Sequence, residues 1–223
     1  MLLGHYAVAL AAKRYAPRTS LGTLILAAQL LDLMWPVFLL LGWERVNIVP
    51  GLMAASPFDF VHYPISHSLL MAVVWAMLLA GGYQVFRRYR RGSAVIAIAV
   101  VSHWFLDAPM HRPDLPLWPG STTLIGAGLW NSIAATIVIE VSLLLAGFLI
   151  YVRSTRPQDR IGTHALFALI AFLGLIFVIG FFAPPPSSPH ALALAGFAMW
   201  LLVPWGSWID RHRESRRLHS SFG

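Results

Sequence analysis

The sequence predicts an all-α polytopic membrane protein with about six transmembrane helices and a short N-terminal helix that is re-entrant or spans half the bilayer. Three observations support this fold class. The 223 residues are 58% hydrophobic and 11% charged, apolar runs recur along the whole chain, and basic residues gather in alternate connections between those runs. Because a chain of this composition cannot expose its side chains to water, we expect it to be integral to a membrane.

The apolar runs account for the predicted helices in chain order. A helix needs about 20 apolar residues to cross a bilayer. Apolar runs lie at residues 20–42, 66–86, 93–108, 124–151, 163–183 and 190–208. Most of them are long enough to cross, although the run at 93–108 is short. Residues 2–12 form a further run, which at about 1.5 Å per residue reaches only partway across. Since Lys13 and Arg14 follow this run instead of preceding it, we do not expect a secretory signal.

The basic residues predict the orientation. With six spans, all but Arg45 and Arg112 of the 16 basic residues fall on one side. The residues on that side are Lys13, Arg14, Arg18, Arg87, Arg88, Arg90, Arg91, Arg153, Arg156, Arg160, Arg211, Arg213, Arg216 and Arg217. The positive-inside rule makes that side cytoplasmic, and the C-terminus with it. The net charge of +7 then reflects topology and contact with membrane lipid. Because the charges are dispersed over short loops, no nucleic-acid partner is expected.

The two longest connections, residues 43–65 and 109–123, fall on the opposite, outward side. Both are rich in Pro and aromatic residues, which predicts ordered caps at the membrane surface. No hydrophilic segment is long enough to bury a core of its own, so a separate soluble domain is not expected. We expect one bundle, in which residues 1–120 bear a polar site and residues 121–223 supply the C-terminal transmembrane helices.

Five ionisable side chains interrupt the apolar runs of the N-terminal half. His103 and Asp107 lie about one helical turn apart and therefore share a face. The others are His5, Asp32 and His67. An Asp inside a membrane costs about 2.5 kcal/mol or more unless a partner compensates it. Counting about 1.5 Å per residue from the basic connections gives these groups similar depths, so we expect them to converge in the outer half of the bilayer.

Two carboxylates and three imidazoles are the ligand set of zinc, manganese or iron hydrolase sites. The expected ligands of a divalent transition metal, with zinc the first expectation and one or two ions, are His5, Asp32, His67, His103 and Asp107. Asp107 or Asp32 is the candidate general base, and His62 is a candidate proton shuttle. Ser66 and Ser102 are candidates for orienting ligand imidazoles. A site in the outer leaflet predicts a lipid or lipid-linked substrate, with phosphoester, ester and amide bonds all open.

The polar groups also form short motifs in a fixed order. These are Gly4-His5, Asp32 with Pro36, His62 through Leu69, Ser102-His103 through Asp107, and Leu117-Trp118-Pro119. With them, residues 1–120 resemble the inner-membrane-associated metal-dependent hydrolases, also described as LexA-binding hydrolases. The resemblance implies a metal-dependent hydrolase of the bacterial inner membrane. Met34 and Trp35 stand where the family pattern has Asp and His, which leaves open one metal, two metals, or binding without catalysis.

Two other functions stay open. The cluster could hold a cation in transit, as in a transporter or a metal-binding membrane protein, or the chain could be a structural partner without activity. The inward parts of two spans, residues 71–82 and 93–101, are nearly free of polar groups, which favours a site closed on that side. The absence of Cys excludes thiol catalysis.

Three further polar residues receive weaker expectations. Glu140 lies within an apolar run, where an interhelical hydrogen bond is the favoured role. His111 is a candidate replacement ligand, although Pro109 argues against a continuous helical face. His190 is expected on the outward side and is assigned to no site.

Overall fold

The computed structural model describes residues 1–216 and confirms a helical membrane protein; Arg217, one of the predicted cytoplasmic charges, lies outside the described residues. Helices long and apolar enough to cross a membrane are α5 (Leu69–Arg87), α6 (Arg90–Met110), α7 (Ile133–Ser154), α8 (Arg160–Phe182) and the segment Pro189–Arg211. That last segment consists of α9 (Pro189–Gly196), the 3₁₀ turn η2 (Phe197–Leu201) and α10 (Leu202–Arg211). A bent pair of shorter helices counts as a sixth span, which gives the predicted number of six.

The sixth span is a broken helix, where the apolar pattern predicted a continuous one over residues 20–42. It consists of α2 (Leu21–Ala28) and α3 (Leu30–Leu40), which meet at an angle of 56°. The Ala28 carbonyl, at the end of α2, accepts a hydrogen bond from the His103 side chain of α6. A tertiary partner therefore replaces a helical one at the break, and sequence periodicity does not report such a partner.

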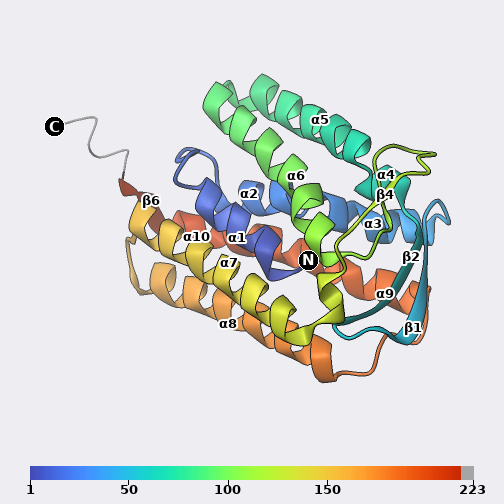
Figure 1. Ribbon diagram of the computed structural model, residues 1–223. Coiled ribbons are helices and arrows are strands. Elements are labelled where there is room, and N and C mark those ends of the chain that lie inside the picture. The colour runs from blue at the N-terminus through green and yellow to red at the C-terminus, as the bar shows by residue number, and fades with distance from the viewer. Residues whose placement is uncertain (217–223) are drawn as a thin grey trace.

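The short N-terminal helix α1 (Leu3–Ala12) lies at the centre of the bundle (Figure 1). It packs along α7, and an added Cβ on Gly147 would lie only 2.4 Å from the Ala7 carbonyl oxygen. Only glycine permits so close an approach of the two backbones. Most of α1 is buried, and its N-terminal end stops inside the protein instead of reaching the far side.

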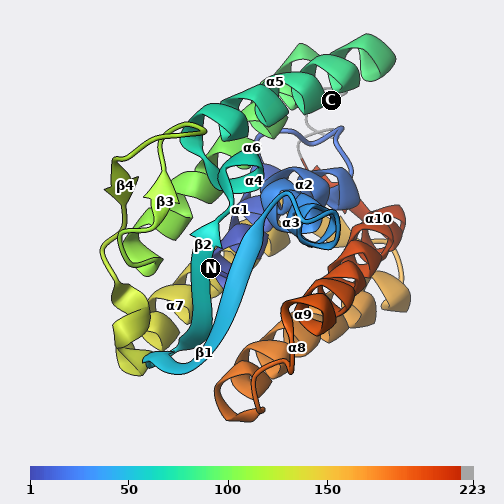
Figure 2. The ribbon, with the colours of Figure 1, turned by 90° about the vertical axis from the view of Figure 1, so that its right-hand side faces the viewer.

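The end of the molecule opposite the basic connections is covered by an antiparallel β-hairpin, β1 (Arg45–Met53) and β2 (Ser56–His62) (Figure 2). A single helical turn, α4 (Pro64–His67), links the hairpin to α5. The second long connection forms β3 (Leu115–Pro116), β4 (Leu124–Ile125) and the 3₁₀ turn η1 (Leu129–Asn131). We call this the hairpin end; its two caps enclose the polar site.

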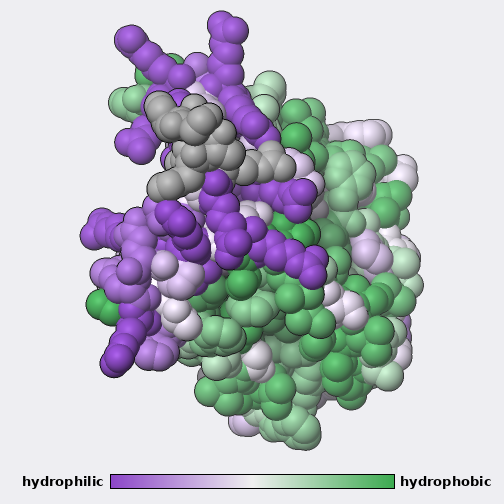
Figure 3. Space-filling view, turned by 90° about the vertical axis from the view of Figure 1, so that its left-hand side faces the viewer, coloured by the Kyte–Doolittle hydropathy of each residue, from purple (hydrophilic) through white to green (hydrophobic). Residues whose placement is uncertain are grey.

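The four basic connections lie together at the other end of the bundle (Figure 1). There β5 (Thr155–Pro157) pairs with β6 (Arg213–Ser215). Figure 3 shows hydrophilic side chains gathered on one part of this face, beside a largely hydrophobic surface. Large apolar side chains such as Met77, Phe86 and Phe182 are exposed on the helices, as contact with lipid requires.

Candidate metal centre

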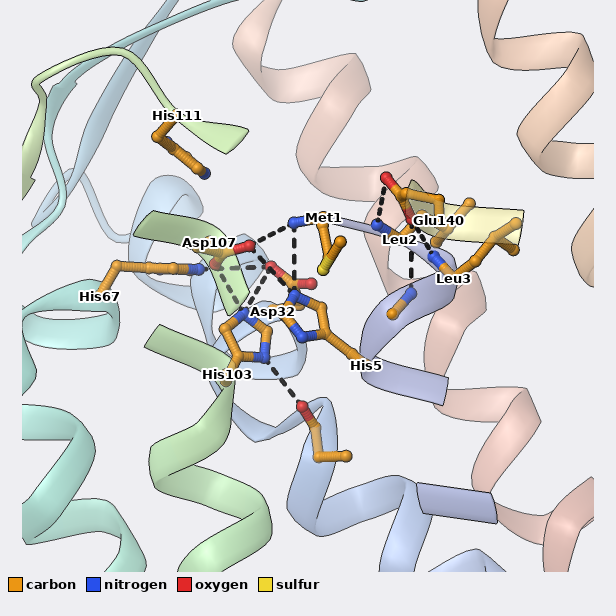
Figure 4. A network of polar contacts seen from close by, with 12 residues as sticks. Met1, Leu2, Leu3, His5, Asp32, His67, His103, Asp107, His111 and Glu140 are labelled. Carbon is orange, nitrogen blue, oxygen red and sulfur yellow. Dashed lines mark hydrogen bonds and ion pairs between the residues drawn. The ribbon is translucent and has the colours of Figure 1, made fainter. Parts of the chain in front are cut away.

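The five predicted ligand side chains meet at one place in the structure (Figure 4). They come from four helices: His5 from α1, Asp32 from α3, His67 from α4, and both His103 and Asp107 from α6. The ligand atoms of His5, His103 and Asp107 lie within 4.8 Å of one another, and those of Asp32, His67 and His103 form a second such group. Because His103 belongs to both groups, the two candidate metal positions adjoin.

The helix break determines which nitrogen of His103 carries its proton. His103 Nδ1 lies 2.8 Å from the Ala28 carbonyl oxygen, which can only accept, so Nδ1 is the donor. The other nitrogen, Nε2, is buried and has no hydrogen-bond partner within residues 1–216. It faces Asp107 Oδ2 at 3.1 Å and Asp32 Oδ1 at 3.6 Å. In a neutral ring this places a lone pair against two carboxylate oxygens, an arrangement that requires a cation between them or a proton on Nε2.

His67 is oriented in the same way by a buried carboxylate that the sequence did not single out. The Ser66 hydroxyl donates to Glu44 Oε2 at 2.6 Å, and Ser66 Oγ lies 2.7 Å from His67 Nδ1. Since the hydroxyl proton goes to the carboxylate, Ser66 accepts from His67 Nδ1–H. His67 Nε2 then presents its lone pair toward Asp32 Oδ1 at 3.3 Å. Glu44 also accepts the backbone amides of Ile65 and Ser66, which fixes the turn of α4.

His5 reaches the cluster because α1 begins beside it. His5 Nε2 lies 3.1 Å from Asp107 Oδ1, and the α-amino group of Met1 pairs with the same carboxylate. Glu140 of α7 accepts hydrogen bonds from the backbone amides of Leu2, Leu3 and Gly4. The expected interhelical hydrogen bond of Glu140 is therefore present, and it satisfies the first amides of α1, which have no acceptor within the helix.

The geometry and chemistry of these side chains fit a transition-metal ion. Ligand atoms at about 2.0–2.2 Å from a tetrahedral ion lie about 3.3–3.6 Å apart. The nitrogen-to-oxygen separations in the cluster are 3.1, 3.3 and 3.6 Å. Within residues 1–216, Asp32 and Asp107 form ion pairs with imidazoles and the Met1 amine and with no Lys or Arg. The site therefore offers two carboxylates to a cation without a competing basic side chain.

A cavity of about 710 Å³ opens onto the cluster from the hairpin end. Asp32, His67, Asp107 and Glu140 contribute polar groups to its wall. The rest of the wall is mainly apolar and comes from the hairpin and from α3, α8 and α9, with Trp35 among its side chains. The arrangement admits an apolar molecule to a site with polar groups at its base.

His111 lines the same cavity but stands outside both ligand groups. Its Nδ1 is 2.9 Å from Asp114 Oδ1, and the Tyr63 hydroxyl donates to the same oxygen at 2.8 Å. Burial lowers the pKa of His111 below its usual value and raises the pKa of Tyr63 well above its usual value. Among residues 1–216 His111 joins neither group of ligand atoms, so its role as a replacement ligand stays a prediction. Helix α6 nevertheless continues through Pro109 to Met110.

Three other residues singled out in the sequence lie apart from the cluster. His62 is exposed at the end of β2, and His190 is exposed at the start of α9. Within the described part of the chain, no hydrogen bond or ion pair joins either of them to the five side chains. The Ser102 hydroxyl donates to the Ala99 carbonyl of its own helix at 2.8 Å. Ser102 therefore does not orient an imidazole, in contrast to the expectation.

Sequence reasoning missed Glu44, Tyr63 and Asp114. Glu44 and Asp114 lie in the polar outward connections, where an acidic residue is unremarkable by position. Their burial, at 1% and 7% exposure, appears only when the hairpin and the loop after α6 fold over the site. The one signal available in the sequence is an acidic residue within a segment rich in Pro and aromatic residues. Whether that residue is buried cannot be read from composition.

Comparison with known proteins places most of this arrangement in one family. A family model described as YdjM inner membrane protein matches residues 1–186. The match extends well beyond residue 120, where the motif resemblance ended, and includes α7 and α8, whose side chains line the cavity. No curated protein and no solved structure matches the chain.

Proposed function

This chain belongs to the YdjM inner membrane protein family and is an integral inner-membrane protein, and from that premise we propose that it is a metal-dependent hydrolase embedded in the membrane. Its proposed substrate is a lipid or lipid-linked molecule that contains a phosphoester, ester or amide bond. Its proposed cofactor is a divalent transition metal, with zinc the best match to the imidazole and carboxylate donors.

One observation carries the metal assignment: two imidazoles with fixed tautomers aim their free nitrogens at carboxylate oxygens. His103 and His67 each use Nδ1–H in a hydrogen bond with a neighbour, which leaves Nε2 for the centre of the cluster. Metal-binding histidines characteristically donate the other ring N–H to an oxygen acceptor in this way. A cation between these lone pairs and the carboxylate oxygens stabilises the arrangement, which without one needs a proton on Nε2.

The chemistry follows from the donor set and the surroundings. A zinc ion at such ligands lowers the pKa of coordinated water to about 7. Asp32 and Asp107 supply the negative charge that holds the ion. Glu140 positions His5 through the amides of α1, and Glu44 positions His67 through Ser66.

The shape of the cavity supports hydrolysis over transport. From the cluster toward the basic end, α2 and α6 present fully buried apolar side chains, including Leu24, Ile96 and Val100. A transported cation would have to pass these apolar side chains, at high cost. The opening lies instead at the hairpin end, among apolar walls that suit acyl or polyprenyl chains.

The test uses the full-length protein in lipid nanodiscs loaded with zinc or manganese. Release of product from a panel of lipid phosphoesters, lipid-linked esters and amides is measured beside metal uptake into proteoliposomes. Hydrolysis of one class with no uptake is the expected result, and it should disappear in Asp107→Ala but persist in His190→Ala. Metal uptake without hydrolysis would show that the protein is a carrier and not a hydrolase. Metal binding without either activity would indicate an inactive structural partner.

A further inference from the structure

A second polar group reaches the cavity through His111, and within the described residues no side-chain hydrogen bond joins it to the candidate metal ligands. It consists of His111, Asp114 and Tyr63, which the fold brings together from the loop after α6 and the end of the hairpin. All three side chains are buried. The His111 ring packs between Phe60 and Trp130, with ring centroids 4.8 and 4.4 Å away. Such a ring is held in one orientation.

Hydrogen bonding determines the tautomer of His111. Asp114 Oδ1 lies 2.9 Å from His111 Nδ1, and as a carboxylate oxygen it can only accept, so Nδ1 carries the proton. Tyr63 donates to the same oxygen, and Arg112 lies 3.4 Å from the other carboxylate oxygen. These contacts hold the Asp114 carboxylate in place. The lone pair of His111 Nε2 remains for the cavity, and Figure 4 shows the ring extending toward the cluster.

We propose that His111 is the proton-transfer residue of this cavity and that Asp114 is its positioning residue. The proposal rests on the hydrolase function proposed above. His111 Nε2 accepts a proton from the attacking water as its oxygen bonds to the phosphorus or carbonyl carbon of the substrate. The bond to the leaving group then breaks, and the proton passes from Nε2 to the leaving-group oxygen or nitrogen. Atoms and charge balance without a further reactant.

The two carboxylates predicted from the sequence as general bases are less suited to that role than His111. Asp32 and Asp107 were the candidate bases, but each of them lies within ligand distance of imidazole nitrogens and is needed to hold a cation. His111 has no such duty. A buried imidazole paired with an ionised carboxylate is a recurrent arrangement for moving protons, because the carboxylate fixes the ring and stabilises its charged form.

The resting state of His111 suits this role. The ring donates Nδ1–H to Asp114 and keeps the lone pair of Nε2, so it is able to accept a proton. The titratable and charged groups that face the ring are Asp114, Tyr63, Asp107 and the Met1 amine, with Arg112 behind Asp114. Of these, the two carboxylates favour the protonated ring and therefore assist it when the proton arrives.

The experiment compares the wild type with His111→Gln, Asp114→Asn and the control His190→Gln in zinc-loaded nanodiscs. The probes are bis(p-nitrophenyl) phosphate and the p-nitrophenyl ester of a long-chain fatty acid. For the probe that the wild type cleaves, kcat should fall about 10²- to 10⁴-fold in His111→Gln, with zinc content unchanged. In Asp114→Asn, kcat should fall less, and the acidic limb of its pH profile should move. His190→Gln should match the wild type.

Two results would overturn the assignment. Unchanged kcat and pH profile in His111→Gln would remove the proton-transfer role, and loss of zinc in parallel with kcat would make His111 a ligand or a structural residue. A readout independent of activity is the ¹⁵N NMR spectrum of the histidine side chains, with His111 assigned by its loss in His111→Gln. The neutral Nδ1–H tautomer is expected, and an Nε2–H tautomer would refute the Asp114 pairing.

The same experiment separates failure of the two proposals. If the wild type cleaves no probe and no lipid of the wider panel, the hydrolase function fails and the proton-transfer role fails with it, whatever the tautomer. If the wild type is active and His111→Gln is as active as the wild type, the hydrolase function stands and the role proposed for His111 is wrong.

Discussion

The imidazole rings of His5 and His103 stack face to face, with centroids 3.6 Å apart and planes inclined by 9°. His5 belongs to the short central helix and His103 to α6, so the stack joins two helices at the cluster. Both rings direct Nε2 at Asp107, at 3.1 Å from its two different oxygens. Two charged imidazoles would repel one another at this separation. The stack therefore excludes a charge on both rings at once, and a neutral ring is the form that binds metal.

Removal of either group on α6 is expected to abolish metal binding. His103 belongs to both candidate ligand groups, and the two carboxylate oxygens of Asp107 face His5 Nε2 and His103 Nε2. His103→Ala and Asp107→Ala should therefore lose the one or two equivalents of transition metal expected in the purified wild type, as measured by elemental mass spectrometry. His190→Ala changes an exposed histidine and should retain them. Wild-type stoichiometry in His103→Ala would show that the metal lies elsewhere.

The two serines predicted to orient imidazoles should now behave differently. Ser66→Ala removes the acceptor of His67 Nδ1–H and leaves Glu44 without one donor, so zinc affinity should fall about 10- to 100-fold. Ser102 bonds only to a carbonyl of its own helix among its described contacts, so Ser102→Ala should bind zinc as the wild type does. Competition with a fluorescent zinc chelator measures both. Equal affinities in the two variants would contradict the proposed orientation of His67.

Close packing of α1 against α7 predicts a strong dependence on glycine at one position. A Cβ at residue 147 would lie 2.4 Å from the Ala7 carbonyl oxygen, and backbone cannot move aside cheaply. Gly147→Ala should destabilise the protein by about 1–3 kcal/mol and lower its thermal unfolding midpoint in detergent. At Gly174, on α8, an added Cβ meets no atom within 4 Å, so Gly174→Ala serves as the control. A normal midpoint for Gly147→Ala would mean that α1 does not pack as described.

Acid should loosen the start of α8. The Gly162 amide donates to Asp159, and together with the pairing of His212 it holds the pKa of the Asp159 carboxyl below its usual value. A depressed carboxyl pKa stabilises the fold above the unfolded value of about 4, and this contribution is lost as pH falls through the lower folded value. The unfolding midpoint of the wild type should therefore drop between roughly pH 5 and pH 3 more than that of Asp159→Asn. Equal acid sensitivity in both proteins would assign the effect to other groups.

The broken span shows the limit of reading helices from hydropathy. Residues 20–42 are mostly apolar, and nothing in their periodicity marks Gln29 as the position where α2 ends and α3 turns away by 56°. The break is stabilised by His103, which lies far along the chain and takes the Ala28 carbonyl. Likewise, two serines close together in the sequence have different partners: Ser68 caps α5, whereas Ser66 bonds to His67. Local sequence specifies donors and acceptors but not their distant partners.

The sequence alone determined the class of the protein, its spans and the short central helix, because apolar length and charge distribution are properties of local composition that a bilayer reads directly. It also identified all five side chains that meet, because ionisable groups in apolar runs are costly wherever they lie. Only the tertiary structure decided which hydrogen-bond partners orient these side chains and His111. The Ala28 carbonyl, Glu44 and Asp114 become buried acceptors through the helix break and the folding of the two outward caps, and hydrogen-bond direction depends on such long-range neighbours.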